Sequence, residues 1–328
     1  FIMKTILISG GAGYLGTFLT QELIKKNKVV VYDTFYFPWL KKNIKKIPFR
    51  SRLSFIEKDI NKATIEDFKS VDIVIDLNGI SNDPSSELNK KHTWSLNNFQ
   101  RRKFAKLARK AGVARYIFNS TCSVYGFSKK ISYENRKKNP ISTYAKANLE
   151  AEKYIYNLRN NSFKVNCLRN STLFGFSQTM RLDLVVNIWV YNLLKNKNIV
   201  IDGDGEQFRP FLSLNDVSNV YKAIIIKHKS FGSFICNLVS FNLKIKNLAE
   251  QIVKIINKKG TKIVYNPNNK DKRNYVVGSN IFKNKFWKNF KFSKFKTEIK
   301  NLYFKMKSNK TKLNDQTIRM KYYKKILK

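Results

Sequence analysis

The sequence TILISGGAGYLG at residues 5–16 decides the fold class. It begins with a short apolar run, 5–8, which is typical of a buried strand in a parallel sheet. Glycines follow at positions 10, 13 and 16, and apolar residues then recur with a helical period from Leu15 to Ile24. Glycines between a strand and a helix permit a tight turn, a close approach of the backbone to a pyrophosphate, and close packing of the helix on the strand. The stretch therefore predicts a dinucleotide-binding turn.

A carboxylate after the second predicted strand supports this interpretation. The apolar run 29–32 ends at Asp33, 17 positions after Gly16, and a separation of about 20 is expected for a carboxylate that binds the ribose hydroxyls of adenosine. Asp33 would repel a 2′-phosphate and no arginine directly follows it, so NAD is preferred to NADP. Gly11, Gly13 and Gly16 also fit the spacing G-x-G-x-x-G, so glycine spacing alone does not distinguish subfamilies.

Strands and helices alternate through the first half of the chain. Apolar runs at 53–56, 71–75, 115–118 and 164–168 predict strands, and the helical patterns at 99–111 and 144–158 lie between them. This alternation predicts the α/β class, a doubly wound parallel sheet with helices on both faces. Beyond residue 170 we expect a helix at 185–194 and a strand at 199–201.

The charge of the chain admits two interpretations. With 64 Lys+Arg against 22 Asp+Glu, the net charge is +42, as in a nucleic-acid-binding protein. However, 51 of the 64 are lysines, whereas recognition of phosphate and bases exploits the guanidinium. The lysines accompany abundant Asn, Ile, Phe and Tyr, as a compositional bias of an AT-rich genome would produce. We favour that bias and expect no nucleic acid as the main partner.

The basic C-terminal region contains interleaved aromatic residues. From 281 onward there are 16 Lys+Arg, alternating in part with Phe282, Phe286, Trp287, Phe290, Phe292 and Phe295. Such a segment can form a nucleic-acid or anionic-membrane surface. A partly buried closing segment with a lysine-coated outer face explains it equally well and is favoured here.

Other counts restrict the chemistry and the location. Three cysteines without a CxxC pair suggest neither a disulfide framework nor a zinc cluster, and two histidines make a multi-histidine metal site improbable, so no metal is expected. No apolar run reaches the ~18 residues of a membrane span, and the first residues show no signal-peptide pattern. We therefore expect a cytoplasmic protein without a membrane span.

Several further motifs occur in a fixed order and carry a family resemblance. They include STCSVYG at 120–126, PISTYAK at 140–146, GDG at 203–205 with Arg209-Pro210-Phe211, and DKRNY at 271–275. With the glycine turn, they resemble the extended short-chain dehydrogenase/reductases that act on nucleotide sugars, the NAD-dependent epimerase/dehydratase family. The resemblance implies a Rossmann-type NAD-binding fold with a smaller C-terminal substrate-binding region.

The resemblance also implies domain boundaries and partners. We expect the NAD-binding domain at 1–168, with 211–240 returning to it. The substrate-binding region would comprise 169–210 and 241–305, and a basic tail would occupy 306–328. The partner would be a nucleotide-sugar substrate, and the helices 99–111 and 144–158 could form the two-fold interface of a homodimer.

Individual residue roles follow from the resemblance. Tyr144 matches the catalytic tyrosine, and Thr121 matches the residue that orients the reacting sugar oxygen. Arg209 and Arg273 match basic residues that bind the substrate diphosphate, a role that suits guanidinium groups. The expected NAD-binding residues are Gly10, Gly13, Tyr14, Leu15, Gly16, Asp33, Asp59, Ile60, Leu77, Asn78 and Asn97.

One catalytic position departs from the family pattern. The family has Tyr-x-x-x-Lys, but position 148 is Asn. A lysine four residues after Tyr144 would share its helix face and favour the phenolate, whereas Lys146 lies about 200° around the helix. Asn148 could bind a ribose hydroxyl but carries no charge. Since a free tyrosine has a pKa of ~10, activity is expected to be slow, shifted to higher pH, rescued by another lysine in space, or absent.

The neighbouring residues favour one reaction over the others. The 4,6-dehydratases of this family resemble Thr-Asp-Glu at the position where this chain has Thr121-Cys122-Ser123. Cys122 is expected to be a buried structural thiol. Epimerisation needs no further acid or base, so we predict an NAD-dependent nucleotide-sugar epimerase, similar to UDP-glucose 4-epimerases. A reductase or dehydrogenase, or a non-catalytic protein that retains NAD binding, stays open.

Overall fold

The computed structural model describes residues 3–128, 130–227, 230–268, 273–282 and 290–326. A sheet of seven parallel strands has the order β10-β6-β5-β4-β1-β2-β3. This topology confirms the predicted α/β class and doubly wound parallel sheet. The strands are β1 (Thr5–Ser9), β2 (Lys28–Asp33), β3 (Leu53–Glu57), β4 (Ile73–Asp76), β5 (Arg115–Thr121), β6 (Lys164–Asn170) and β10 (Phe234–Leu238).

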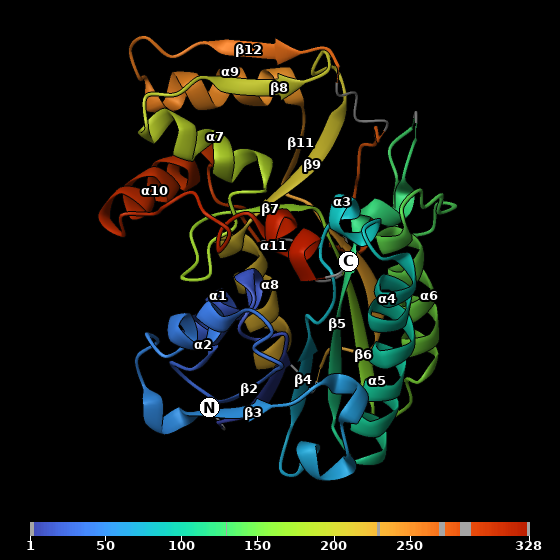
Figure 1. Cartoon of the computed structure of the whole chain (residues 1–328). Helices are drawn as coiled ribbons and strands as arrows, with labels where there is room; N and C mark the ends of the chain where they lie inside the picture. The colour runs from blue at the N-terminus through green and yellow to red at the C-terminus, as the bar shows by residue number, and fades with distance from the viewer. Residues whose placement is uncertain (1–2, 129, 228–229, 269–272, 283–289, 327–328) are drawn as a thin grey trace.

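Helices cover both faces of this sheet (Figure 1). Residues alternate between the faces along β1: Ile6 and Ile8 join the core on one side, and Leu7 joins the core on the other. One face is covered by α1 (Tyr14–Leu23) and α8 (Leu214–Ile226), and the other by α5 (Arg101–Lys110) and α6 (Thr143–Asn157). Shorter helices are α2 (Pro38–Ile44), α3 (Asp83–Ser86) and α4 (Lys90–Trp94), with a π-helical turn at Ser95–Gln100 and 3-10 turns at Arg50–Arg52, Ile60–Lys62, Ile65–Phe68 and Cys122–Tyr125.

The second half of the chain adds smaller sheets and helices above the main sheet (Figure 1). Its hydrophobic core is continuous with that beneath α1 and α8. Because α8 and β10 belong to the main sheet layer, the chain returns to that layer between 214 and 238. The added elements are β7 (Thr172–Phe174), β8 (Ile199–Asp202), β9 (Phe208–Ser213), β11 (Phe241–Lys244), β12 (Ile263–Asn266), α7 (Val185–Leu194), α9 (Ile245–Ile256) and α10 (Phe295–Ser308).

The C-terminal region folds back onto the rest of the protein. Phe282, Phe290 and Phe292 pack on one another with ring centroids 5.1–5.2 Å apart and contact the main core. Residues 283–289, including Phe286 and Trp287, lie outside the described residues, as do Asp271 and Lys272. The segment predicted as a tail, 306–328, contains the end of α10 and then α11 (Arg319–Ile326), which lies between α1 and α3 (Figure 1).

None of the helices in the described ranges combines the length and the apolar character that crossing a bilayer requires. Within the same ranges, His, Cys, Asp and Glu side chains form no group of three or more that could hold a metal ion.

The glycine turn is restricted by close packing of backbone on backbone. Gly10 has a φ of +68°, which favours glycine. A Cβ at Gly16 would lie 2.5 Å from the Gly10 carbonyl oxygen and 2.6 Å from the Gly11 Cα. Side chains of any size at position 16 therefore force α1 away from β1.

Replacing Gly16 with alanine should destabilise the protein. We expect Gly16→Ala to lower the free energy of unfolding by about 1–3 kcal/mol, the usual cost of overpacking, as measured by urea denaturation. Gly232→Ala is the matched control, because a Cβ there meets nothing within 4 Å. Equal stability of the two variants would contradict the packing argument.

Candidate functional site

A cleft of about 1040 Å³ opens at the carboxyl ends of β1, β2, β4 and β5. Ligands bind at this edge in doubly wound sheets. Of the residues predicted from the sequence, those that line the cleft are Gly10, Gly13, Tyr14, Leu15, Gly16, Asp33, Asp59, Leu77, Asn78, Thr121, Tyr144, Arg209 and Arg273. Three predicted residues, Ile60, Asn97 and Asn148, are not part of its lining.

The glycine turn and Asp33 form one end of the cleft. Gly13 precedes the first residue of α1, so the amide-rich start of that helix faces the cleft. Asp33 accepts hydrogen bonds from the backbone amides of Ala12 at 3.1 Å and Phe35 at 2.9 Å. Burial raises the pKa of Asp33, while these amide hydrogen bonds lower it. The turn carries no side chains on its glycines, which fits the diphosphate of a dinucleotide. The carboxylate of Asp33 beside the turn fits the ribose.

The remaining predicted cofactor residues divide into lining and supporting positions. The Tyr14 hydroxyl donates to the Gly175 carbonyl oxygen at 2.7 Å, which ties the lining to the second half of the chain. Asn97 is buried, and its amide group makes two hydrogen bonds of 2.9 Å with the backbone of Ile80. Ile60 is buried in the core beside α5. Asn97 and Ile60 thus support the wall of the cleft from behind.

Tyr144 and Thr121 meet at the other end of the cleft. Thr121 is the last residue of β5, and Tyr144 is the second residue of α6, which Ser142 caps through a 3.1 Å bond from the Ala145 amide. Burial raises the pKa of Tyr144 above its ordinary value, and the neighbouring Thr121 side chain lowers it. Asp83 adds to the increase, whereas Arg101 opposes it. Tyr144 is therefore a neutral phenol at neutral pH.

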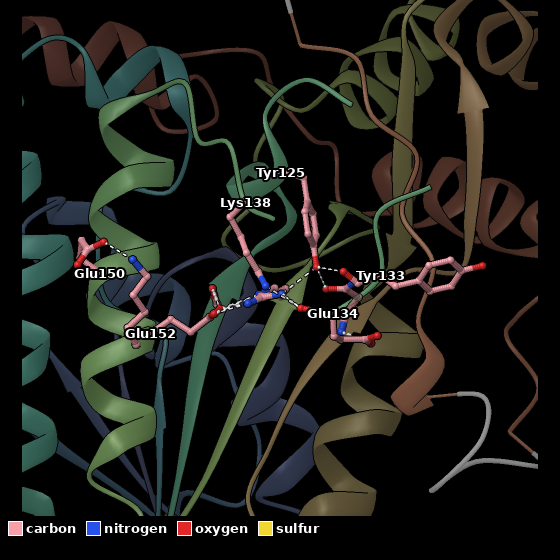
Figure 2. Close-up of polar contacts among 10 residues, drawn as sticks. Tyr125, Tyr133, Glu134, Lys138, Glu150 and Glu152 are labelled. Atoms are coloured by element: carbon pink, nitrogen blue, oxygen red, sulfur yellow. Dashed lines mark hydrogen bonds and ion pairs between the residues drawn. The ribbon is translucent and has the colours of Figure 1, made fainter. Parts of the chain in front are cut away.

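A buried polar network holds the end of β5 in place (Figure 2). Glu152 extends from α6 and accepts hydrogen bonds from the Arg169 guanidinium at 2.5–3.2 Å and from Ser120 at 2.6 Å. Arg169 also donates to the Tyr125 hydroxyl at 2.8 Å. The Cys122 thiol donates to the Arg169 carbonyl oxygen and is 1% exposed, so the prediction of a buried structural thiol is confirmed.

Asn148 points away from the cleft and toward a buried arginine. Arg101 donates to the Asn148 side-chain oxygen at 2.7 Å, and the Asn148 amide group donates to the Tyr144 carbonyl oxygen at 2.8 Å. Arg101 is 2% exposed and forms an ion pair with Asp76 at 2.9 Å. The side-chain oxygen of Asn148 thus accepts a hydrogen bond from Arg101, which lies in the interior next to the position where the family has a lysine.

Asp76 does more than cap the turn that follows β4. One carboxylate oxygen accepts from the Asn78 amide at 3.1 Å and from the Ser9 hydroxyl at 3.0 Å. The other accepts from Arg101 and from the Tyr116 hydroxyl at 2.8 Å. Asp76, which is fully buried, therefore connects the turn to the Arg101 network.

The two predicted diphosphate-binding arginines differ in their surroundings. Arg209 is 5% exposed and donates to the backbone carbonyl oxygens of Phe208 and Arg273. Arg273 forms an ion pair with Asp83 inside the cleft. A substrate diphosphate would have to compete with Asp83 for Arg273.

Sequence reasoning missed several charged residues of the cleft. Asp83 belongs to α3, where Ser142 and Arg273 donate to it. Arg181 and Asp183 form an ion pair at 2.9 Å, and Arg319 and Tyr323 reach the cleft from α11. Only Asn82-Asp83-Pro84 has a local signal, as a helix-start motif, because the others occupy loops or the C-terminal helix.

The fold and the cleft can be compared with known proteins. The sequence profile described as "NAD dependent epimerase/dehydratase family" matches residues 6–237. The chain belongs to this family. NAD is the family's cofactor, and the Rossmann-type fold and the glycine turn agree with it.

Relatives of several activities resemble the chain. It is 30% identical over 236 residues to the uncharacterized UDP-glucose epimerase YtcB of Bacillus subtilis, covering 69% of this chain and 74% of YtcB. It is 24% identical to human dTDP-D-glucose 4,6-dehydratase, covering 77% and 74% of the two chains. Among solved structures, UDP-N-acetylglucosamine 4-epimerase from Methanobrevibacter ruminantium M1 superposes with a TM-score of 0.82 at 22% identity, covering 94% of this chain and all of that one. The family assignment therefore leaves the specific reaction open.

The contact between Arg101 and Asn148 predicts that a lysine at 148 is unfavourable on its own. Asn148→Lys removes a hydrogen bond and places an ammonium beside a buried guanidinium, so we expect a loss of about 3 kcal/mol or more in unfolding free energy. In an Arg101→Met background the same substitution should cost clearly less, because Asp76 then lacks its cation. Urea denaturation of the four proteins gives the coupling energy.

Asn157→Lys is the matched control for this cycle, since Asn157 is exposed on the same helix. Its cost should be within about 0.5 kcal/mol of zero, as is usual for surface substitutions. Additive effects of Asn148→Lys and Arg101→Met would show that the two positions are not coupled.

Proposed function

We propose that the protein is an NAD-dependent nucleotide-sugar epimerase. The observation that carries the proposal is that Tyr144 and Thr121 line the same cleft as the glycine turn. A phenol and a hydroxyl at this position can hold one sugar hydroxyl between them. We also propose the roles of the other lining residues as the family resemblance implies them.

The residues of the chain would act on the proton and the oxygen of the sugar. NAD, when bound, would supply the acceptor and donor of a hydride for the sugar carbon. Tyr144 removes the hydroxyl proton as a general base and returns it when the hydroxyl forms again. Thr121 holds the oxygen during both steps. Arg209, buried in the cleft wall, would bind the diphosphate.

The residues beside Thr121 favour epimerisation over dehydration. Elimination of water needs an additional acid and base, but the Cys122 thiol is buried and burial raises its pKa far above the ordinary value. Asp83 lies in the cleft with Arg273 paired to it and Ser142 donating to it, so its carboxylate already has partners. The match to relatives named UDP-glucose epimerases supports the same choice.

The protein's pH dependence should reflect the missing lysine. Burial raises the pKa of Tyr144, and Arg101, a buried cation that opposes this increase, is paired with Asp76. The phenolate is the active form, so its fraction grows with pH as long as the pH is below that pKa. We expect kcat to increase between about pH 7 and pH 9. A flat profile over this range would contradict a base with a raised pKa.

The reaction is tested by incubating the holoenzyme with UDP-, dTDP-, GDP- and CDP-sugars. We expect a product of unchanged mass with one inverted centre, seen by NMR. Loss of one water would indicate a dehydratase, and net formation or consumption of NADH would indicate a dehydrogenase or reductase.

Tyr144→Phe provides the matched variant for this experiment, because it removes only the hydroxyl. We expect turnover to fall by at least about 10²-fold, the usual contribution of a general base, with NAD affinity unchanged. Turnover similar to the native protein would exclude Tyr144 as the base.

A further inference from the structure

The C-terminal helix α11 forms part of the cofactor cleft. The Leu182 amide donates to the Thr317 carbonyl oxygen at 2.7 Å just before the helix begins. Ser85 contacts the Met320 sulfur at 3.5 Å, and the Tyr323 ring packs edge-on against Phe37 at 5.4 Å. Figure 1 shows α11 in the middle of the molecule, beside α3 and above α1. These contacts attach residues near the chain end to both sides of the cleft.

Arg319, the first residue of α11, brings a buried guanidinium into the cleft. It is 7% exposed and lines the cavity together with the glycine turn. Its Nε and Nη2 atoms have no hydrogen-bond partner within the described ranges. Its guanidinium lies 4.6 Å from the centre of the Phe37 ring.

The carboxylates near Arg319 already have other partners. Asp33 accepts from the backbone amides of Ala12 and Phe35, and Asp183 accepts from Arg181 and Asn82. Burial lowers the pKa of Arg319, in agreement with a cation that lacks full compensation. Leaving buried donors of a charged group unsatisfied costs free energy. An anion bound in the cleft would remove this cost.

We propose that Arg319 binds a phosphate group of a nucleotide held in the cleft. Its position favours the diphosphate of the dinucleotide, because Phe37 follows Asp33 at the glycine-turn end. There the guanidinium would face the same anion as the amides at the start of α1. The assignment rests on the cofactor pocket of the proposed function, but not on the reaction that follows.

Nucleotide affinities test the assignment directly. In calorimetric titrations of nucleotide-free protein, Arg319→Met should lower the affinity for NAD about tenfold or more, as expected for loss of a charge-assisted bond to phosphate. Adenosine, which has no phosphate, should bind equally to both proteins. The control is Arg50→Met, since Arg50 is exposed and outside the cleft lining.

Titrations with NADP and UDP identify which phosphate is bound. If the variant loses affinity equally for NAD and NADP, Arg319 binds the diphosphate of the cofactor. If it loses more affinity for NADP, Arg319 binds the 2′-phosphate. If it loses affinity for UDP alone, Arg319 binds the diphosphate of the substrate. Unchanged affinities for all three would overturn the proposal, as would an equal loss for adenosine.

Thermal denaturation separates a ligand role from a structural one. Without nucleotide, Arg319→Met should melt at the same or a higher temperature than the native protein, because it removes an uncompensated buried charge. NAD should raise the melting temperature of the variant by less than it raises that of the native protein. A lower melting temperature without ligand, together with an unchanged stabilisation by NAD, would show that Arg319 serves packing alone. A protein that binds NAD through Arg319 but epimerises no sugar would refute the proposed function and leave this assignment intact.

Discussion

The ion pair between Arg101 and Asp76 connects the elements whose ends form the cleft. The guanidinium donates to the backbone of β4 at Asp76, to β5 at Asn119, both at 3.0 Å, and to α6 at Asn148. It also stacks on Phe118, with its carbon 3.9 Å from the ring centre. Breaking a buried pair by removing one partner typically costs about 3–5 kcal/mol. The geometry around Tyr144 therefore depends on the buried charge of Arg101.

This arrangement explains how the chain folds with an asparagine where the family has a lysine. A lysine at 148 would project an ammonium toward a guanidinium that is fixed by several bonds. Asn148 instead accepts from Arg101 and donates to the Tyr144 backbone, so it satisfies both neighbours without adding charge. For Tyr144 as the proposed base this is unfavourable, because Asn148 brings no cation to the phenol and the charge of Arg101 is paired with that of Asp76. At position 148, the residue that best suits the buried Arg101 is therefore not the residue that would best stabilise a phenolate.

The sequence predicted the main sheet well because its signals are local. Apolar runs of strand length, the glycine turn and helical periodicity each depend on neighbours within about a dozen residues. The motifs also placed Tyr144, Thr121 and Asp33 in one cleft. What the sequence could not show is contact between distant segments, such as Arg319 on Phe37 or Arg273 on Asp83. The sequence also could not show where a side chain points. Asn97 and Asn148 are polar and lie near the motifs, yet both side chains face the interior.

The distribution of basic residues bears on the large positive charge. No lysine within the described ranges is buried, whereas six of the thirteen arginines are. The planar guanidinium is less strongly hydrated than an ammonium and offers five donors, so it suits buried positions with several acceptors. Arg101 and Arg169 fit this rule, since backbone oxygens and carboxylates surround them. Arg319 departs from it: the cation is buried, and none of the residues that the structure describes supplies acceptors for Nε and Nη2, which is the arrangement expected where a ligand supplies them.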